Sequence, residues 1–131
     1  MSVYYLTVPM LPPSNNSNAV RSHWRGFHQA KKLWQASLDD AIRAERVPVG
    51  SGLFVRATVE FTAPDRRKRD ADNHEWVVRK ALGDALQDAG VLENDTPDDW
   101  SWTSGRFNYR KGERATTVVL ELVDDFGEAA A

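Results

Sequence analysis

Residues 54–88 read FVRATVEFTAPDRRKRDADNHEWVVRKALGDALQD, a strand pattern, a charged loop and a helix pattern in direct succession. In the first part an apolar side chain stands at every second position from Val55 to Phe61, with polar side chains between them. Strict alternation of this kind is typical of a half-buried strand, here over 54–62. After the loop, apolar residues recur at three- and four-residue spacing, which predicts a helix over 73–88.

Weaker patterns on both sides of this unit complete the expected order of elements. A β-branched and aromatic run over 3–8 predicts a first strand, and apolar spacing over 24–46 predicts a long helix. Two further strand patterns, 102–110 and 115–123, flank Lys111-Gly112-Glu113, which is typical of a hairpin. The sequence therefore predicts an α/β (or α+β) fold in the order β-α-β-α-β-β, with a mixed sheet.

Length and composition favour a single compact domain over residues 1–131, with 124–131 as a frayed tail. A chain of 131 residues can build one hydrophobic core but not two. The chain has no cysteine, which excludes disulfides, thiolate zinc sites and cysteine nucleophiles. It has no apolar run that could span a bilayer and no signal-peptide pattern, so we expect a cytoplasmic protein without a membrane partner.

The net charge of −2 conceals an uneven distribution along the chain. Residues 1–69 hold eleven Lys and Arg against five Asp and Glu, whereas residues 70–131 hold six against fourteen. The two parts therefore carry +6 and −8. This division either reflects a basic surface for a polyanion beside an acidic cluster for a cation, or disappears when folding mixes the two parts.

Chemically active side chains are densest between the strand and the helix of residues 54–88. Arg66 to Arg69 are four consecutive cations, and Asp70 and Asp72 follow with one residue between them. In an extended segment both carboxylates face one side, where their repulsion costs on the order of 4 kcal/mol at about 4 Å. A Mg²⁺ ion would remove that cost, because it prefers oxygen ligands and phosphate. The alternative is an ordinary capped helix N-terminus, although four preceding cations are unfavourable there.

A third carboxylate follows the predicted helix. The loop after the helix could return Asp95 toward Asp70 and Asp72. The alternative is a solvated acidic loop that also contains Asp98 and Asp99.

Within the predicted helix, Lys80 shares a face with Asn73 and Asp84. Its side chain could lean toward the helix N-terminus and stabilise charge that develops on a phosphate. The alternative is an ion pair with Asp84, four residues away.

Other enzyme classes find little support in the sequence. The three histidines have no metal-ligand spacing, and the serines have no convincing general base. A glycine-rich phosphate loop is absent, so we expect no nucleotide cofactor.

Three blocks of the chain together resemble the RusA family of Holliday-junction resolvases, over nearly the whole length. The first is the strand that runs into Pro12-Pro13-Ser14-Asn15-Asn16, and the second is the basic run with Asp-x-Asp-Asn over 64–73. The third is the helix segment 80–86 followed by Ala89-Gly90-Val91 and the acidic loop. The resemblance implies a RusA-like fold in a bacterial or phage-infected cell.

The resemblance also implies an activity and its residues. The activity would be that of a homodimer that binds a four-way DNA junction and makes paired symmetrical nicks with Mg²⁺, or Mn²⁺ as a substitute. Asp70, Asp72 and Asp95 correspond to metal-binding and catalytic aspartates, and Lys80 to the catalytic lysine. The candidate DNA contacts are Arg66, Arg67, Lys68, Arg69, Asn15, Asn16, Arg21 and Arg25.

The chain departs from the family pattern at two places. The stretch between Asn73 and Lys80 is about one helical turn longer than in compact members, so Arg79 is an alternative cation at the site. The acidic loop reads Asn94-Asp95 where two aspartates are common, which leaves Asp98 or Asp99 as substitutes for one of them.

Two other hypotheses remain open from the sequence. The first is a branched-DNA-binding dimer of the same fold in which the acidic cluster does not assemble and no cleavage occurs. The second is a metal-dependent phosphohydrolase of small molecules, which would bind its substrate in a closed pocket with little dependence on salt.

Overall fold

The computed structural model describes residues 2–13 and 24–123, and only the backbone at positions 24, 25, 72 and 73. The elements follow the predicted order β-α-β-α-β-β along these residues, which confirms that expectation. Their bounds are β1 Ser2–Val8, α2 Trp24–Ala44, β2 Phe54–Ala63, α3 Ala71–Asp88, β3 Trp100–Tyr109 and β4 Ala115–Val123.

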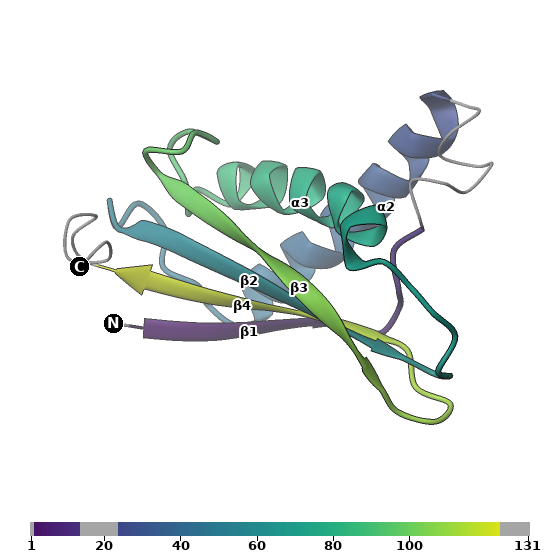
Figure 1. The fold of residues 1–131 in the computed structure, drawn as a ribbon. Coiled ribbons are helices and arrows are strands. Elements are labelled where there is room, and N and C mark those ends of the chain that lie inside the picture. The colour runs from purple at the N-terminus through teal and green to yellow at the C-terminus, as the bar shows by residue number, and fades with distance from the viewer. Residues whose placement is uncertain (1, 14–23, 124–131) are drawn as a thin grey trace.

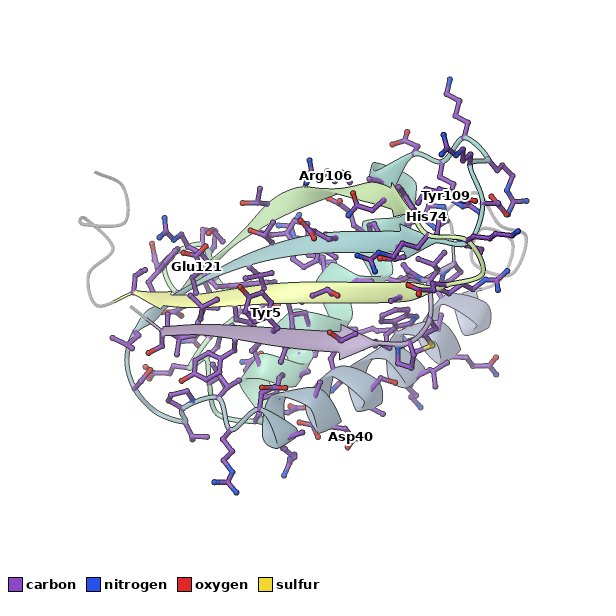
Figure 2. All side chains as sticks on the ribbon, turned by 90° about the horizontal axis from the view of Figure 1, so that it is seen from below. Tyr5, Asp40, His74, Arg106, Tyr109 and Glu121 are labelled. Carbon is purple, nitrogen blue, oxygen red and sulfur yellow. The ribbon has the colours of Figure 1, made fainter. Side chains whose placement is uncertain are left out.

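The four strands form one mixed sheet in the order β1-β4-β2-β3. Strand β4 is antiparallel to both β1 and β2, whereas β3 is parallel to β2. Both helices cover the same face of the sheet, as Figure 1 shows. Figure 2 shows the uncovered face, where Glu121 and Arg106 lie on the same side as the exposed Tyr5.

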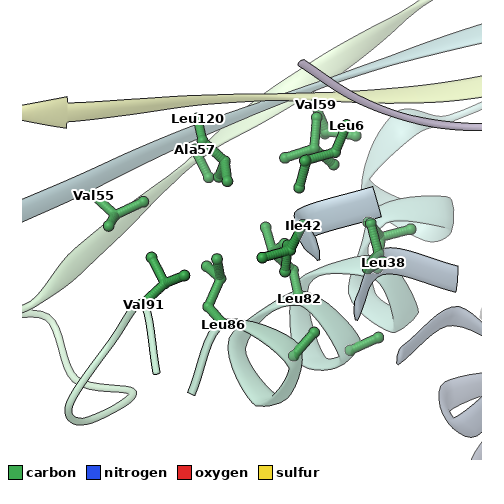
Figure 3. Close-up of a cluster of buried hydrophobic side chains, with 14 of the residues drawn as sticks. Leu6, Leu38, Ile42, Val55, Ala57, Val59, Leu82, Leu86, Val91 and Leu120 are labelled. Atoms are coloured by element: carbon green, nitrogen blue, oxygen red, sulfur yellow. The ribbon is translucent and has the colours of Figure 1, made fainter. Parts of the chain in front are cut away.

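The strand β2 lies at the centre of the sheet because both of its edges are paired. Its odd-numbered residues from Val55 to Ala63 are buried under the helices, as the alternation predicts. The core between sheet and helices contains Trp34, Leu38 and Ile42 of α2 together with an apolar stripe of α3. Figure 3 shows Leu38 and Ile42 beside Leu82 and Leu86 of that stripe. Neither described helix combines the length and hydropathy that crossing a membrane requires.

The expected hairpin between the last two strands is wrong. Strand β4 pairs with β1 and β2 and does not neighbour β3, so the connection between β3 and β4, residues 110–114, crosses the end of β2. Two hydrogen bonds fasten it there, from Arg110 N to Ala63 O (3.0 Å) and from Gly112 N to Pro64 O (3.2 Å). A turn sequence sets the local reversal of the chain but not the strand with which the next segment pairs.

Helix α3 begins at Ala71, two residues earlier than the sequence pattern predicts. Asp70 therefore occupies the N-cap position, and Asp72 belongs to the first turn instead of an extended segment. At the other end the helix stops at Asp88, as the apolar spacing predicts, two residues before Gly90. Gly90 has a φ of 78°, and Val91 N donates to Leu86 O at 2.9 Å.

Candidate active site

Residues 64–69, between β2 and the N-cap residue Asp70, form the cationic loop. Asp65 orders it from within, because its carboxylate accepts hydrogen bonds from Arg67 N (3.0 Å) and from the Arg69 guanidinium (2.9 Å). The same guanidinium donates to the carbonyl oxygens of Asp65 and Arg67. These contacts lower the pKa of the Asp65 carboxyl, first through the Arg67 backbone bond and then through Arg69. The loop is thus a turn held by its own charged groups.

Three of the four cations in this loop face outward. Arg66, Arg67 and Lys68 are exposed, and the Arg66 guanidinium lies 4.7 Å from the centre of the Tyr109 ring. The side chain of Arg69 is only 9% exposed and is turned into the loop. Arg69 therefore shapes the loop, while the other three present charge beside the exposed Asp70.

Two contacts, one from β3 and one on the C-terminal half of α3, hold Asp95 in place. Its Oδ1 accepts a hydrogen bond from Trp100 Nε1 at 2.5 Å. Its Oδ2 lies over Gly83, where a Cβ atom would be only 2.6 Å away. A side chain at position 83 would displace the carboxylate, so the glycine is what admits Asp95 to this position. The sequence pattern predicts neither contact.

Arg79, rather than Lys80, shares a cavity with Asp95. This cavity has a volume of about 320 Å³ and is also lined by Trp100, Ser101 and Trp102 of β3. Lys80 is exposed and does not line it.

The alternative role for Lys80, an ion pair with Asp84, is not formed either. Asp84 forms its ion pair with Lys31 of α2 at 2.5 Å, and among the described residues Lys80 has no acidic partner. The Lys80 side chain is therefore exposed and not engaged by Asp84.

One chain does not bring Asp95 to Asp70. Gly83, which Asp95 contacts, lies twelve residues beyond Ala71, or about 18 Å along the helix axis. The cationic loop before Asp70 and the acidic loop that contains Asp95 lie at opposite ends of α3 in Figure 1. No three histidine, aspartate or glutamate side chains in the described part of the chain gather closely enough to hold a metal ion. Asp72 does not enter this comparison, because its side chain lies outside the described residues.

The two substitute aspartates lie elsewhere in the acidic loop. Asp98 is exposed, and Asp99 accepts a hydrogen bond from the Thr96 hydroxyl at 3.3 Å. Asp99 lines a separate cavity of about 370 Å³ together with Glu93. Neither aspartate lines the cavity that contains Arg79.

Glu75 is a functional candidate that the sequence reasoning missed. Its carboxylate is buried, with 8% of the residue exposed, and accepts three hydrogen bonds from β3. The donors are Trp102 Nε1 (3.1 Å), Ser104 Oγ (2.9 Å) and Gly105 N (3.2 Å). The bond to Gly105 lies where the pairing register of β2 and β3 shifts, so Glu75 satisfies a backbone N–H in the irregular part of the strand. It thereby fastens the first turns of α3 to β3.

His74 makes a second attachment of the same turns. Its Nδ1 lies 3.0 Å from Pro12 O, and its ring packs edge-on against Phe107. The histidine therefore connects the start of α3 to the segment that follows β1. The sequence shows only that His74 has no metal-ligand spacing to the other histidines and does not predict this contact.

Several predicted DNA contacts lie outside the described residues. These are Asn15, Asn16 and Arg21, together with the side chain of Arg25. Their assignment stays a prediction.

Comparison with known proteins places this chain in a family, although no protein-family model matches it. It is 36% identical over 98 residues to the crossover junction endodeoxyribonucleases RusA of Enterobacteria phage 82 and of Escherichia coli K12. These matches cover 72% of this chain and 76% of each relative. The protein of the same name from Escherichia coli O139:H28 is 31% identical over 129 residues, which cover 95% of this chain and all of the relative. The resemblance seen in the sequence blocks is thereby confirmed: the chain belongs to the RusA family of crossover junction endodeoxyribonucleases.

Proposed function

We propose that this protein is a metal-dependent endonuclease that resolves four-way DNA junctions by paired, symmetrical nicks, in recombination and repair of DNA. The observation that carries the proposal is the group of three exposed cations, Arg66 to Lys68, in the loop that leads to Asp70 and the start of α3, in a chain of the RusA family. Cations there attract the phosphate backbone to the carboxylate motif. Recognition of the junction would rest on its shape and phosphates more than on base sequence.

The carboxylates suit a hard divalent ion. Asp70 and Asp95 are exposed and offer oxygen ligands only, which favours Mg²⁺ or Mn²⁺. Such an ion, held by Asp70, Asp72 and Asp95, would activate a water for attack on the scissile phosphate.

Because Asp95 lies about 18 Å along α3 from the start of the motif, one chain cannot supply all three ligands to one ion. We therefore place the site in a homodimer, with Asp70 and Asp72 from one chain and Asp95 from the other. A two-fold axis repeats every such site, which accounts for two nicks on opposing strands.

The cations of α3 have the complementary role. Arg79 lines the cavity beside Asp95, so its guanidinium can donate to a non-bridging phosphate oxygen and stabilise the charge that develops there. Lys80 is the residue assigned by family resemblance, and it lies exposed one position farther along the helix. Arg79→Ala is therefore expected to lower nicking more than Lys80→Ala.

The test is cleavage of a synthetic four-way junction with Mg²⁺. Asp70→Asn is expected to abolish nicking and to leave junction binding intact or tighter, because it removes a negative charge close to the phosphates. Asp40→Asn makes the same change at an exposed position of α2 (Figure 2) and should cut as the wild type does. Nicking by Asp70→Asn at the wild-type rate would contradict the proposal.

The separation of Asp70 and Asp95 in one chain also favours a second candidate, a branched-DNA-binding dimer that does not cut. This candidate predicts that wild type binds the junction but leaves it intact with both Mg²⁺ and Mn²⁺. Cleavage with either ion rules it out.

A further inference from the structure

We propose that the β3–β4 connection, residues 110–114, is a second contact for the DNA backbone and forms one continuous basic surface with the cationic loop. The inference rests on the proposed function, since it concerns how the same junction is held. It adds Arg110, Lys111 and Arg114 to the DNA-binding residues. The sequence predicts a hairpin around Lys111-Gly112-Glu113 and assigns no DNA contact to it.

The fold itself brings the two segments together. Strand β2 lies between β4 and β3, so a chain that leaves β3 must cross the end of β2 to enter β4. The cationic loop begins at that same end. The crossing is fastened by the bonds from Arg110 N to Ala63 O and from Gly112 N to Pro64 O. Figure 1 shows the two loops side by side at one end of the molecule.

A stacked pair joins the two segments at the level of side chains. Tyr109, the last residue of β3, is 42% exposed and lies under the Arg66 guanidinium, 4.7 Å from ring centre to Cζ. This contact holds the guanidinium next to the β3–β4 connection. A cation over an aromatic ring keeps its outer N–H groups free for phosphate oxygens.

The charges of the connection are available to a ligand. Arg110, Lys111 and Arg114 are exposed, and in the described ranges none of them forms an ion pair. By contrast, Lys31, Arg43 and Arg56 each have a carboxylate partner.

Net charge favours this surface over the rest of the molecule. Residues 64–69 carry +3 and residues 110–114 carry +2, which leaves −7 on the rest of a chain whose total is −2. A polyanion is repelled by most of such a protein and attracted where the positive charge is concentrated. Two basic segments side by side suit contacts to successive phosphates, which position a duplex arm without reading its sequence.

The experiment measures binding of a fluorescent synthetic four-way junction at several salt concentrations, with EDTA to prevent cutting. The test variant is Arg110→Gln/Lys111→Gln/Arg114→Gln. The matched control is Lys32→Gln/Arg43→Gln/Arg46→Gln, which changes three exposed cations of α2 and the residues after it. Both variants shift the net charge from −2 to −5, so the change of charge is matched, and the control in addition breaks the exposed pair of Arg43 with Asp39.

The expected result is a shallower dependence of log K on log salt for the test variant alone. Each lost phosphate contact lowers the slope by about 0.9, so three contacts lower it by about 2 to 3. Equal slopes and affinities for the test variant, the control and wild type would overturn the inference and leave the proposed function intact. If wild type does not bind the junction at all, the proposed function fails and this inference fails with it.

A variant that binds the junction more tightly gives a second test, because misfolding would weaken binding and not strengthen it. Glu113 is the acidic residue of the connection and is exposed. Glu113→Gln should tighten junction binding at low salt and steepen the salt dependence. Unchanged or weaker binding by a folded Glu113→Gln protein would count against the inference.

Discussion

The two ends of α3 hold their carboxylates in different ways. At the N-terminal end Asp70 is exposed and follows the cationic loop, which is ordered by the contacts of Asp65 with Arg67 N and Arg69. At the C-terminal half Asp95 is fixed by an indole N–H and by the bare backbone of Gly83. The first end presents its carboxylate to solvent beside three exposed cations, whereas the second end holds its carboxylate in a set position.

The largest effect should come from mixing Asp70→Asn with Asp95→Asn. Each variant alone is expected to lose about a thousandfold or more in nicking, since each removes one of the proposed metal ligands. If the two ends of α3 meet across a dimer, mixed dimers contain one site with both aspartates intact. Random exchange of subunits should then restore about a quarter of the wild-type sites.

The measurement is nicking of the junction after the two inactive proteins are unfolded and refolded together. Nicks should be single instead of paired, because each mixed dimer has only one complete site. No recovery in a mixture that still binds the junction would show that the two aspartates do not combine between chains. Each inactive variant unfolded and refolded alone serves as the control, because every site in its dimers lacks one of the two aspartates.

Gly83→Ala, in the C-terminal half of α3, should lower nicking without lowering the free energy of unfolding. A Cβ atom there would lie 2.6 Å from Oδ2 of Asp95, and the carboxylate is the part that can move away. Nicking should fall about a hundredfold, as expected for a misplaced catalytic group. The free energy of unfolding should rise by up to about 1 kcal/mol, because alanine favours a helix more than glycine does.

Urea unfolding and junction nicking on the same protein test this prediction. A large loss of stability would mean that the contact of Asp95 with Gly83 is a packing contact and not a means of placing the carboxylate. Unchanged nicking would mean that Asp95 does not need this position.

In this chain sequence periodicity predicts the helices and strands well but predicts poorly which strands pair with each other. The alternation in residues 54–62 and the apolar stripe of α3 are repeated over many positions, so both elements are found close to their expected bounds. The hairpin expectation failed because the turn at Gly112 is local, whereas the partner of β4 is set by β2, which can pair on both edges.

The candidate site was predictable in its residue types but not in its assembly. The Asp-x-Asp motif can be recognised from the spacing of its residues. The position of Asp95 beside α3 cannot, because it depends on contacts with Gly83 and Trp100 that form only in the folded chain. Glu75 did leave a signal, because it stands three residues before Val78 on the buried stripe of α3. A charged residue in such a position calls for a satisfied polar partner.

Glu75→Ala should have an intermediate effect at the N-terminal end. The substitution leaves three donors of β3 without their acceptor, which costs about 3 kcal/mol of unfolding free energy. It also loosens the turn that carries Asp72, so nicking should fall about tenfold with junction binding nearly unchanged. Glu75→Gln keeps one acceptor oxygen and should recover part of both losses, measured by urea unfolding and single-turnover nicking.

The smallest expected effect concerns Asp65 and the shape of the cationic loop. Its folded pKa is lowered below the ordinary 3.8, so its contribution to loop order is present above that value and is lost as the pH falls through the lowered pKa. The chemical shift of the Arg67 amide, followed by NMR from pH 7 downward, should report a midpoint below 3.8. Asp65→Asn should remove this step and weaken junction binding only a few-fold, because its amide oxygen still accepts from Arg67 N while the pair with Arg69 is lost. A midpoint at or above the ordinary value would mean that the loop is not held by this carboxylate, and the cations would then owe their placement to Tyr109 and the β3–β4 connection alone.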